Sequence, residues 1–258
     1  MTATGNPLVR EAQDKVREIE RKIQEFFDVV NDFLSWVPGF LSDLIEPIKR
    51  GMENLQQKLT EFWDRVNQLF EQPGNSDRLK EIGEQWVNSV GNVLNDIAGT
   101  IGLDKLKTNI EWTGRAAEAY KATVPAQSQG LTGLKDHSVS MRDSLSSLAD
   151  SIDTFWLAIK VAFVVFLAAI AGAVVTALGG VTIPVAIGVI VAAIAADIGL
   201  VTAAIVALES HVNTIETQQQ TIKQKVNDVG QEWSKSNIAA MSDASVRDGD
   251  GSDWRVNR

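Results

Sequence analysis

The stretch VAFVVFLAAIAGAVVTALGGVTIPVAIGVIVAAIAA, residues 161–196, decides the fold because it runs for 36 residues without one charged side chain. Within it, LGGVTIP (178–184) is a turn signal, so the stretch predicts two apolar helices at about 155–178 and 183–208. At 1.5 Å per residue each helix would be about 36–39 Å long, enough to cross a hydrocarbon core of about 30 Å. The hairpin is apolar on all sides, which favours burial in lipid or in protein.

Small residues are frequent in this predicted hairpin. Gly188, Ala192 and Ala196 form a ridge at a spacing of four, which is typical of packed membrane helices, although the central hairpin of a large soluble bundle also fits. The turn carries no charge, so its transfer across a bilayer costs little. The residues that we assign to a membrane hairpin are Lys160, Gly172, Gly179, Gly180, Pro184, Gly188, Ala192, Ala196 and Asp197.

Asp197 lies well inside the second predicted helix, where an unpaired carboxylate in lipid costs about 2.5 kcal/mol or more. Several arrangements would reduce this cost. The side chain could face a water-filled lumen, pair with Lys160 or a neighbouring chain, or be protonated. Alternatively, the helix is normally buried in protein.

Apolar stripes with steps of three and four flank the hairpin and average 3.5 residues, the period of a coiled-coil seam. They run from Ala12 to Val37, Leu41 to Leu69, Leu79 to Ile101, Leu131 to Phe155 and Leu208 to Trp233. We interpret every stripe as core packing, and we expect the second helix to begin at Pro47. No segment shows the two-residue alternation of a hairpin sheet. The sequence predicts an all-α fold, an elongated antiparallel helical bundle with coiled-coil seams and a central hydrophobic helical hairpin.

These patterns divide the chain into five predicted segments. They are an N-terminal helical hairpin (1–75), a helix-turn-helix (76–155), the hydrophobic hairpin (156–208), a C-terminal helix (209–238) and a polar, disordered tail (239–258).

Composition excludes several classes of function. A net charge of −9 disfavours nucleic acid and anionic lipid as partners. The chain has no Cys and only two His, and no spacing suggests a catalytic constellation, so we expect no enzyme activity, no cofactor, no metal and no small-molecule substrate. The N-terminus has no apolar run after a basic start, so no cleavable signal peptide is predicted.

The motif WTGRAAEAY (112–120) lies between two long helical patterns. Gly114 permits backbone geometry or a close helix approach that a Cβ would obstruct, and Trp112 offers a large apolar anchor with an indole N–H. Trp112, Gly114, Ala117 and Tyr120 resemble the Trp-x-Gly turn of the WXG100 family over about residues 78–155. This resemblance implies export by a type VII secretion system of actinobacteria or related bacteria, and a location that is secreted or cell-envelope-associated.

One departure from the family pattern concerns export. The family signal places Asp or Glu four residues after a Tyr, but Val124 stands four residues after Tyr120, and the chain has no other Tyr. A WXG100-like partner chain would therefore have to supply the signal.

The architecture also resembles α-helical pore-forming toxins, in which a bundle stores an apolar hairpin and releases it on oligomerisation. The leading hypothesis is a type VII-associated protein that shelters and then inserts its hairpin into a lipid membrane, as a homo-oligomer. One alternative is a non-enzymatic structural or chaperone-like WXG partner whose hairpin is buried against another chain. Another is a resident membrane protein with two spans.

Overall fold

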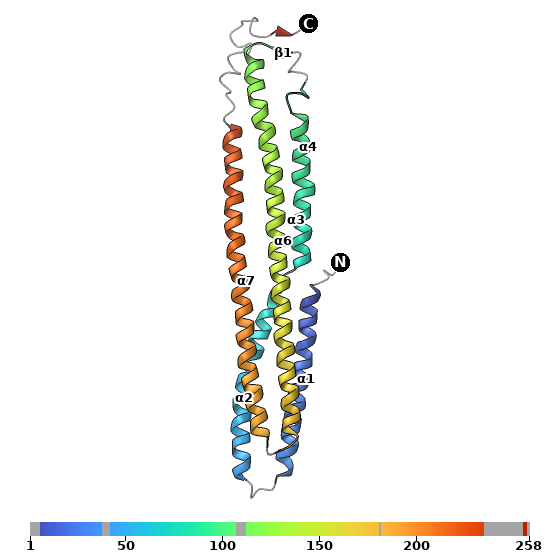
Figure 1. The fold of residues 1–258 in the computed structure, drawn as a ribbon, viewed down its shortest axis with the longest axis vertical. Coiled ribbons are helices and arrows are strands. Elements are labelled where there is room, and N and C mark those ends of the chain that lie inside the picture. Colours follow the sequence, from blue (N-terminus) through green and yellow to red (C-terminus); the bar gives the residue numbers. More distant parts are fainter. Residues whose placement is uncertain (1–5, 38–41, 107–111, 181, 235–254, 257–258) are drawn as a thin grey trace. The chain divides into compact units, whose positions relative to one another are not determined.

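The computed structural model describes residues 6–37, 42–106, 112–180, 182–234 and 255–256 (Figure 1). Nearly all of them are helical, which confirms the predicted all-α fold. The elements are α1 (Pro7–Trp36), α2 (Ser42–Glu71), α3 (Ser76–Trp86), the π-helical turn η2 (Val87–Gly91), α4 (Asn92–Thr100), β1 (Trp112–Thr113), α6 (Arg115–Ala177), α7 (Ile183–Ser234) and β2 (Arg255–Val256).

The chain forms two compact units. The first contains Met1–Ser76 and Ala149–Val212, and the second contains Asp77–Leu148 and Asn213–Arg258. Helices α6 and α7 each pass without interruption from one unit into the other. Two predicted segment boundaries, at 155/156 and 208/209, therefore fall inside continuous helices.

In the first unit, α1 and α2 pack against the C-terminal part of α6 and the N-terminal part of α7 (Figure 1). The predicted seams of α1 and α2 supply much of this core, which confirms their interpretation as packing surfaces. Aromatic rings join α2 to α6, because Phe62 lies with its ring centroid 4.9 Å from that of Phe166 and 6.3 Å from that of Phe163. The buried seam residues are Ala12, Ile19, Ile23, Phe26, Val30, Ile48, Leu55, Leu59, Phe62 and Val66.

Polar contacts fix the start of α1 and the end of α2 against α6. Asn6 caps α1, and its Nδ2 donates to Ser76 Oγ at 3.1 Å and to Asp153 Oδ1 at 2.8 Å. Trp156 Nε1 donates to the carbonyl oxygen of Pro73 at 2.7 Å. Because buried polar groups are costly without partners, these bonds favour one arrangement of the three helices.

The predicted start of α2 at Pro47 is wrong, since the helix begins at Ser42 and contains the proline. Proline inside a helix removes one backbone hydrogen bond. Burial of the next residue, Ile48, in the core favours the helical path nevertheless.

In the second unit, α3, η2 and α4 pack on the N-terminal part of α6 through small residues. Gly83, Gly91 and Ala98 are buried, and a Cβ on Gly91 would lie only 2.9 Å from Ser138 Cβ of α6. The predicted stripe on this segment forms the packing face only in part, because Leu79, Ile82, Val90 and Ile101 are half-buried. Its members Trp86, Val93 and Ile97 are exposed. The glycines allow a close approach that larger apolar side chains would prevent.

Two-residue strands correct the expectation of no sheet. Trp112 pairs with Val256 and Thr113 pairs with Arg255, in antiparallel register. A bridge this short has no periodicity that a sequence pattern could reveal. The predicted disordered tail otherwise lies outside the described residues.

Candidate functional site

The turn of the hydrophobic hairpin is closed by Gly180. Its φ is +68°, its N–H donates to the Ala177 carbonyl at 2.9 Å, and its own carbonyl accepts from the Ile183 N–H at 3.0 Å. A left-handed glycine is a common helix C-cap. The turn also lies against α1, because a Cβ at Gly180 would be 2.6 Å from the Phe33 ring. Pro184 is the second residue of α7, a position where a helix accepts proline.

The two helices of the hairpin bury one face each against α1 and α2. This inner face carries the buried Trp, Phe and Ile side chains of the hairpin. The inner face consists of Trp156, Ile159, Phe163, Phe166, Ile170 and Ala173 on α6, and of Ile183, Ala186, Ile187, Ile190, Ile194 and Val201 on α7.

The opposite, outer face of the hairpin is exposed and apolar. Its large residues are 41% to 70% exposed, and none of them is polar. On each helix the first and last of these residues are 21 positions apart, or about 32 Å along the helix axis. This length matches a hydrocarbon core of about 30 Å. The outer face consists of Leu157, Val161, Val164, Val165, Val175 and Leu178 on the α6 side, and of Val185, Val189, Leu200 and Val206 on α7.

The predicted small-residue ridge lies on this outer face. Gly188, Ala192 and Ala196 are exposed, as are Gly172 and Gly179. A Cβ added at Gly172 or Gly188 would have no neighbour within 4 Å. The ridge therefore packs against nothing among the described residues of this chain.

Lys160 does not pair with Asp197, which was one of the arrangements considered from the sequence. Its Nζ donates to Glu11 Oε2 of α1 at 2.5 Å. Both side chains are partly exposed, so this ion pair contributes at most about 1 kcal/mol. The lysine is long enough to reach α1 and thereby leaves the aspartate without a cation from α6.

Asp197 is instead buried where α7 meets α2. It is 2% exposed, and neither carboxylate oxygen has a hydrogen-bond partner. In this packed bundle, burial raises the pKa of Asp197 to about 7. The small cavity around it is lined by Phe62, Arg65, Val66, Leu69, Ile198 and Val201.

The Trp-x-Gly motif lies in the second unit. Gly114 has φ +107° and stands between β1 and the first residue of α6, and its carbonyl accepts from the Glu118 N–H at 3.1 Å. Of the two roles that the sequence suggested for Gly114, the positive φ corresponds to special backbone geometry. Ala117 is fully buried and Tyr120 is partly buried. The predicted role of the Trp112 side chain as an anchor lies outside what the structure describes.

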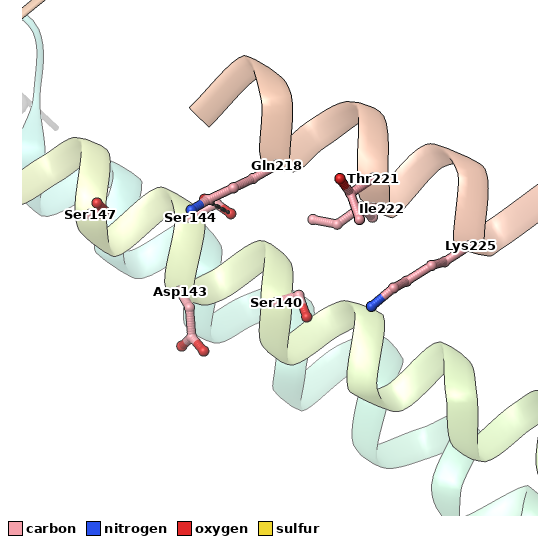
Figure 2. A pocket seen from close by; sticks show the side chains of 8 residues that line it. All are labelled: Ser140, Asp143, Ser144, Ser147, Gln218, Thr221, Ile222 and Lys225. Atoms are coloured by element: carbon pink, nitrogen blue, oxygen red, sulfur yellow. Dashed lines mark hydrogen bonds between the residues drawn. The ribbon is translucent and has the colours of Figure 1, made fainter. Parts of the chain in front are cut away.

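The second unit also has an open, polar cleft of about 330 Å³ between α6 and α7 (Figure 2). Ser144 Oγ donates to Gln218 Oε1 at 2.9 Å across it. Lys225 reaches from α7 toward α6, whereas Asp143 points away from α7 (Figure 2) and accepts two hydrogen bonds from Arg142, which raise the pKa of that guanidinium. The lining contains no histidine or cysteine.

The outer face is the feature that sequence reasoning missed. The signal was present, since Trp, Phe and Ile dominate one side of the α6 part of the hairpin and Ile one side of the α7 part, while Val is the commonest large residue on the other side. A search for apolar length treats both sides alike. Among the described residues, no group of three or more His, Cys, Asp or Glu could hold a metal ion.

Fold and site together define a class: an all-α helical protein with two helices long and apolar enough to cross a membrane. Comparison of the chain with family models, with curated proteins and with solved structures found no match. The resemblance to the WXG100 family therefore stays a prediction that rests on the residues of the motif.

Proposed function

We propose that this protein inserts the hairpin of residues 157–206 into lipid membranes, starting from a state in which α1 and α2 cover its inner face. The observation that carries the proposal is the outer face, whose large exposed residues are all Leu or Val. A surface of this kind costs free energy in water at about 25 cal/mol per Å², and contact with lipid removes that cost.

The cover on the inner face explains why the hairpin needs a change of partners to span a bilayer. Helices α1 and α2 present one buried apolar stripe each and many charged residues elsewhere, so they do not follow the hairpin into lipid. Insertion therefore separates the inner face from α1 and α2. In an oligomer the small residues of Gly188, Ala192 and Ala196 would allow close contact between copies.

The route to the membrane is a second part of the proposal. The Trp112–Tyr120 motif supports export by a type VII secretion system together with a WXG100-like partner chain that carries the export signal. Secretion and the partner rest on this motif alone.

The test is release of an entrapped dye from liposomes by protein purified without detergent. Ala192→Arg places a charge near the middle of the exposed outer face, so the packed bundle tolerates it while insertion costs about 2.5–3.5 kcal/mol more. We expect release by the wild type and at least a tenfold slower release by Ala192→Arg. The matched control, Ala126→Arg, changes an exposed alanine of α6 in the second unit and should release dye like the wild type.

Other outcomes separate the alternatives. A well-folded protein that releases no dye would favour a partner protein as the cover of the outer face, and Ala192→Arg should then weaken that complex. A protein that stays in solution only in detergent would favour a resident membrane protein with two spans.

A further inference from the structure

Asp197 occupies an unusual place for a charged residue. Among the described residues it is the one buried Asp, Glu, Lys, Arg or His, and both of its oxygens lack a hydrogen-bond partner. It lies on the inner side of α7, in contact with the cavity that Phe62, Val66 and Leu69 of α2 line. This is the contact that must open when the hairpin leaves α2.

The charged groups of the packed helices do not neutralise Asp197. Arg65 of α2 lines the same cavity, but it forms no hydrogen bond with Asp197. On α6 and α1, the residues Lys160 and Glu11 are paired with each other. On α7 the next charged residue along the chain is Glu209, which is exposed.

The cost of burying a carboxyl group in such a position depends strongly on its protonation state. The neutral form is tolerated in an apolar cavity, whereas an ionised form without partners is costly. With its pKa raised to about 7 by burial, Asp197 changes between these forms near neutral pH. Ionisation therefore adds a penalty at one point of the contact between α7 and α2.

We propose that Asp197 is a pH-sensitive latch of the hairpin: the contact between α7 and α2 tolerates its protonated side chain, and its ionisation loosens that contact. The biological meaning of the latch rests on the proposed function, because the loosened element is the one that would enter lipid. The carboxylate has to regain a proton before it enters hydrocarbon. Higher pH therefore favours the release of α7 from α2, whereas lower pH favours insertion into lipid. A measurement without lipid isolates the release of α7.

The experiment is hydrogen exchange of the lipid-free full-length protein at pH 5.5 and pH 8.5, read by mass spectrometry on peptides that cover 190–204. After correction for the intrinsic exchange rate, protection of the wild type should fall by about 30-fold at pH 8.5, because opening lets the carboxyl ionise with an ordinary pKa of about 3.9. Asp197→Asn should keep its protection at both values of pH. The control Asp228→Asn, at an exposed position of α7, should behave like the wild type.

Two results would overturn the latch. One is equal protection of the wild type at both values of pH, and the other is the same loss of protection in Asp197→Asn. If either occurs while liposome release is intact, the latch is wrong and the proposed function stands. If protection depends on pH through Asp197 but no condition yields dye release, the latch stands and membrane insertion is wrong.

Discussion

At the scale of single residues, two glycines of the hairpin are in opposite situations. Gly180 has a left-handed backbone with the Phe33 ring against it, whereas Gly172 is helical and a Cβ there would have no neighbour within 4 Å. The same substitution should therefore have opposite effects at the two positions.

We predict that Gly180→Ala lowers the free energy of unfolding by about 1–3 kcal/mol, since it adds both backbone strain and a clash with Phe33. Gly172→Ala should leave it unchanged or raise it by up to about 1 kcal/mol, because alanine loses less backbone entropy than glycine in a helix. Urea unfolding without lipid measures both. Equal effects of the two variants would mean that the turn is not closed as described.

Asp197 gives a pH prediction of the same kind. The packed state holds a carboxyl with a pKa of about 7, while the unfolded chain has an ordinary value of about 3.9, so the folded state binds more protons between these values. The contribution to stability is complete below about pH 3.9 and is lost as pH rises through 7, by up to about 4 kcal/mol. Subtracting the urea stability of Asp197→Asn from that of the wild type over pH 4–8 isolates this term. A flat difference would contradict it.

Single residues differ in how far the sequence predicts them. Glycine in a short turn or before a helix is a recognisable signal, and Gly114 and Gly180 fulfil it. The burial of the Asp197 helix in protein was one of several open possibilities, and a pair with Lys160 was another, which depended on where Lys160 reached. Which arrangement forms depends on the positions of the neighbouring helices, and a sequence pattern does not give these positions.

At the scale of elements, the contact of α3 and α4 with α6 gives a prediction with a built-in control. Gly91→Val should destabilise the second unit by about 1–3 kcal/mol, because a Cβ added at Gly91 would lie only 2.9 Å from Ser138 Cβ. Ile97→Gln, on the exposed stripe, should change stability by less than about 0.5 kcal/mol. Thermal unfolding followed by circular dichroism distinguishes them. The reverse order of effects would restore the predicted stripe as the packing face.

Helices α1 and α2 show when a periodic apolar pattern is sufficient to predict the packing face of a helix. The stripes of α1 and α2 are the only wide apolar faces on those helices, so they had to be the core, and they are. On α3 and α4 an apolar stripe competes with a glycine face, and the close approach at Gly83 and Gly91 leaves part of the stripe, Trp86, Val93 and Ile97, exposed. A periodic pattern indicates where apolar residues lie on a helix, but it does not indicate how closely two helices can approach.

At the scale of the whole molecule, a net charge of −9 affects membrane encounter. Vesicles with anionic lipid repel such a protein, and salt screens that repulsion over a Debye length of about 10 Å at 0.1 M. We predict slower dye release from anionic than from zwitterionic liposomes at low salt, and a smaller difference at 0.3 M salt. A faster response to anionic vesicles would indicate a positive surface that net charge conceals.

The sequence predicts the candidate site only in part. Length and the missing charges of residues 161–196 identified the hairpin. They did not indicate that one face is covered while the other is exposed, because both faces are equally apolar in composition. The pairing of Thr113 with Arg255, across most of the chain, had no local signal at all.

The outer face has one more property, the absence of Trp and Tyr, since its large residues are all Leu or Val. Spanning helices usually carry these aromatic residues at both interfaces, where they hold the helix at one depth. The outer face has no such aromatic belt, and the tip of the hairpin is uncharged. After insertion, Trp156 on the inner face would lie at the base of the hairpin. Depth would therefore be held at the base alone, and the free tip could adjust to bilayers of different thickness.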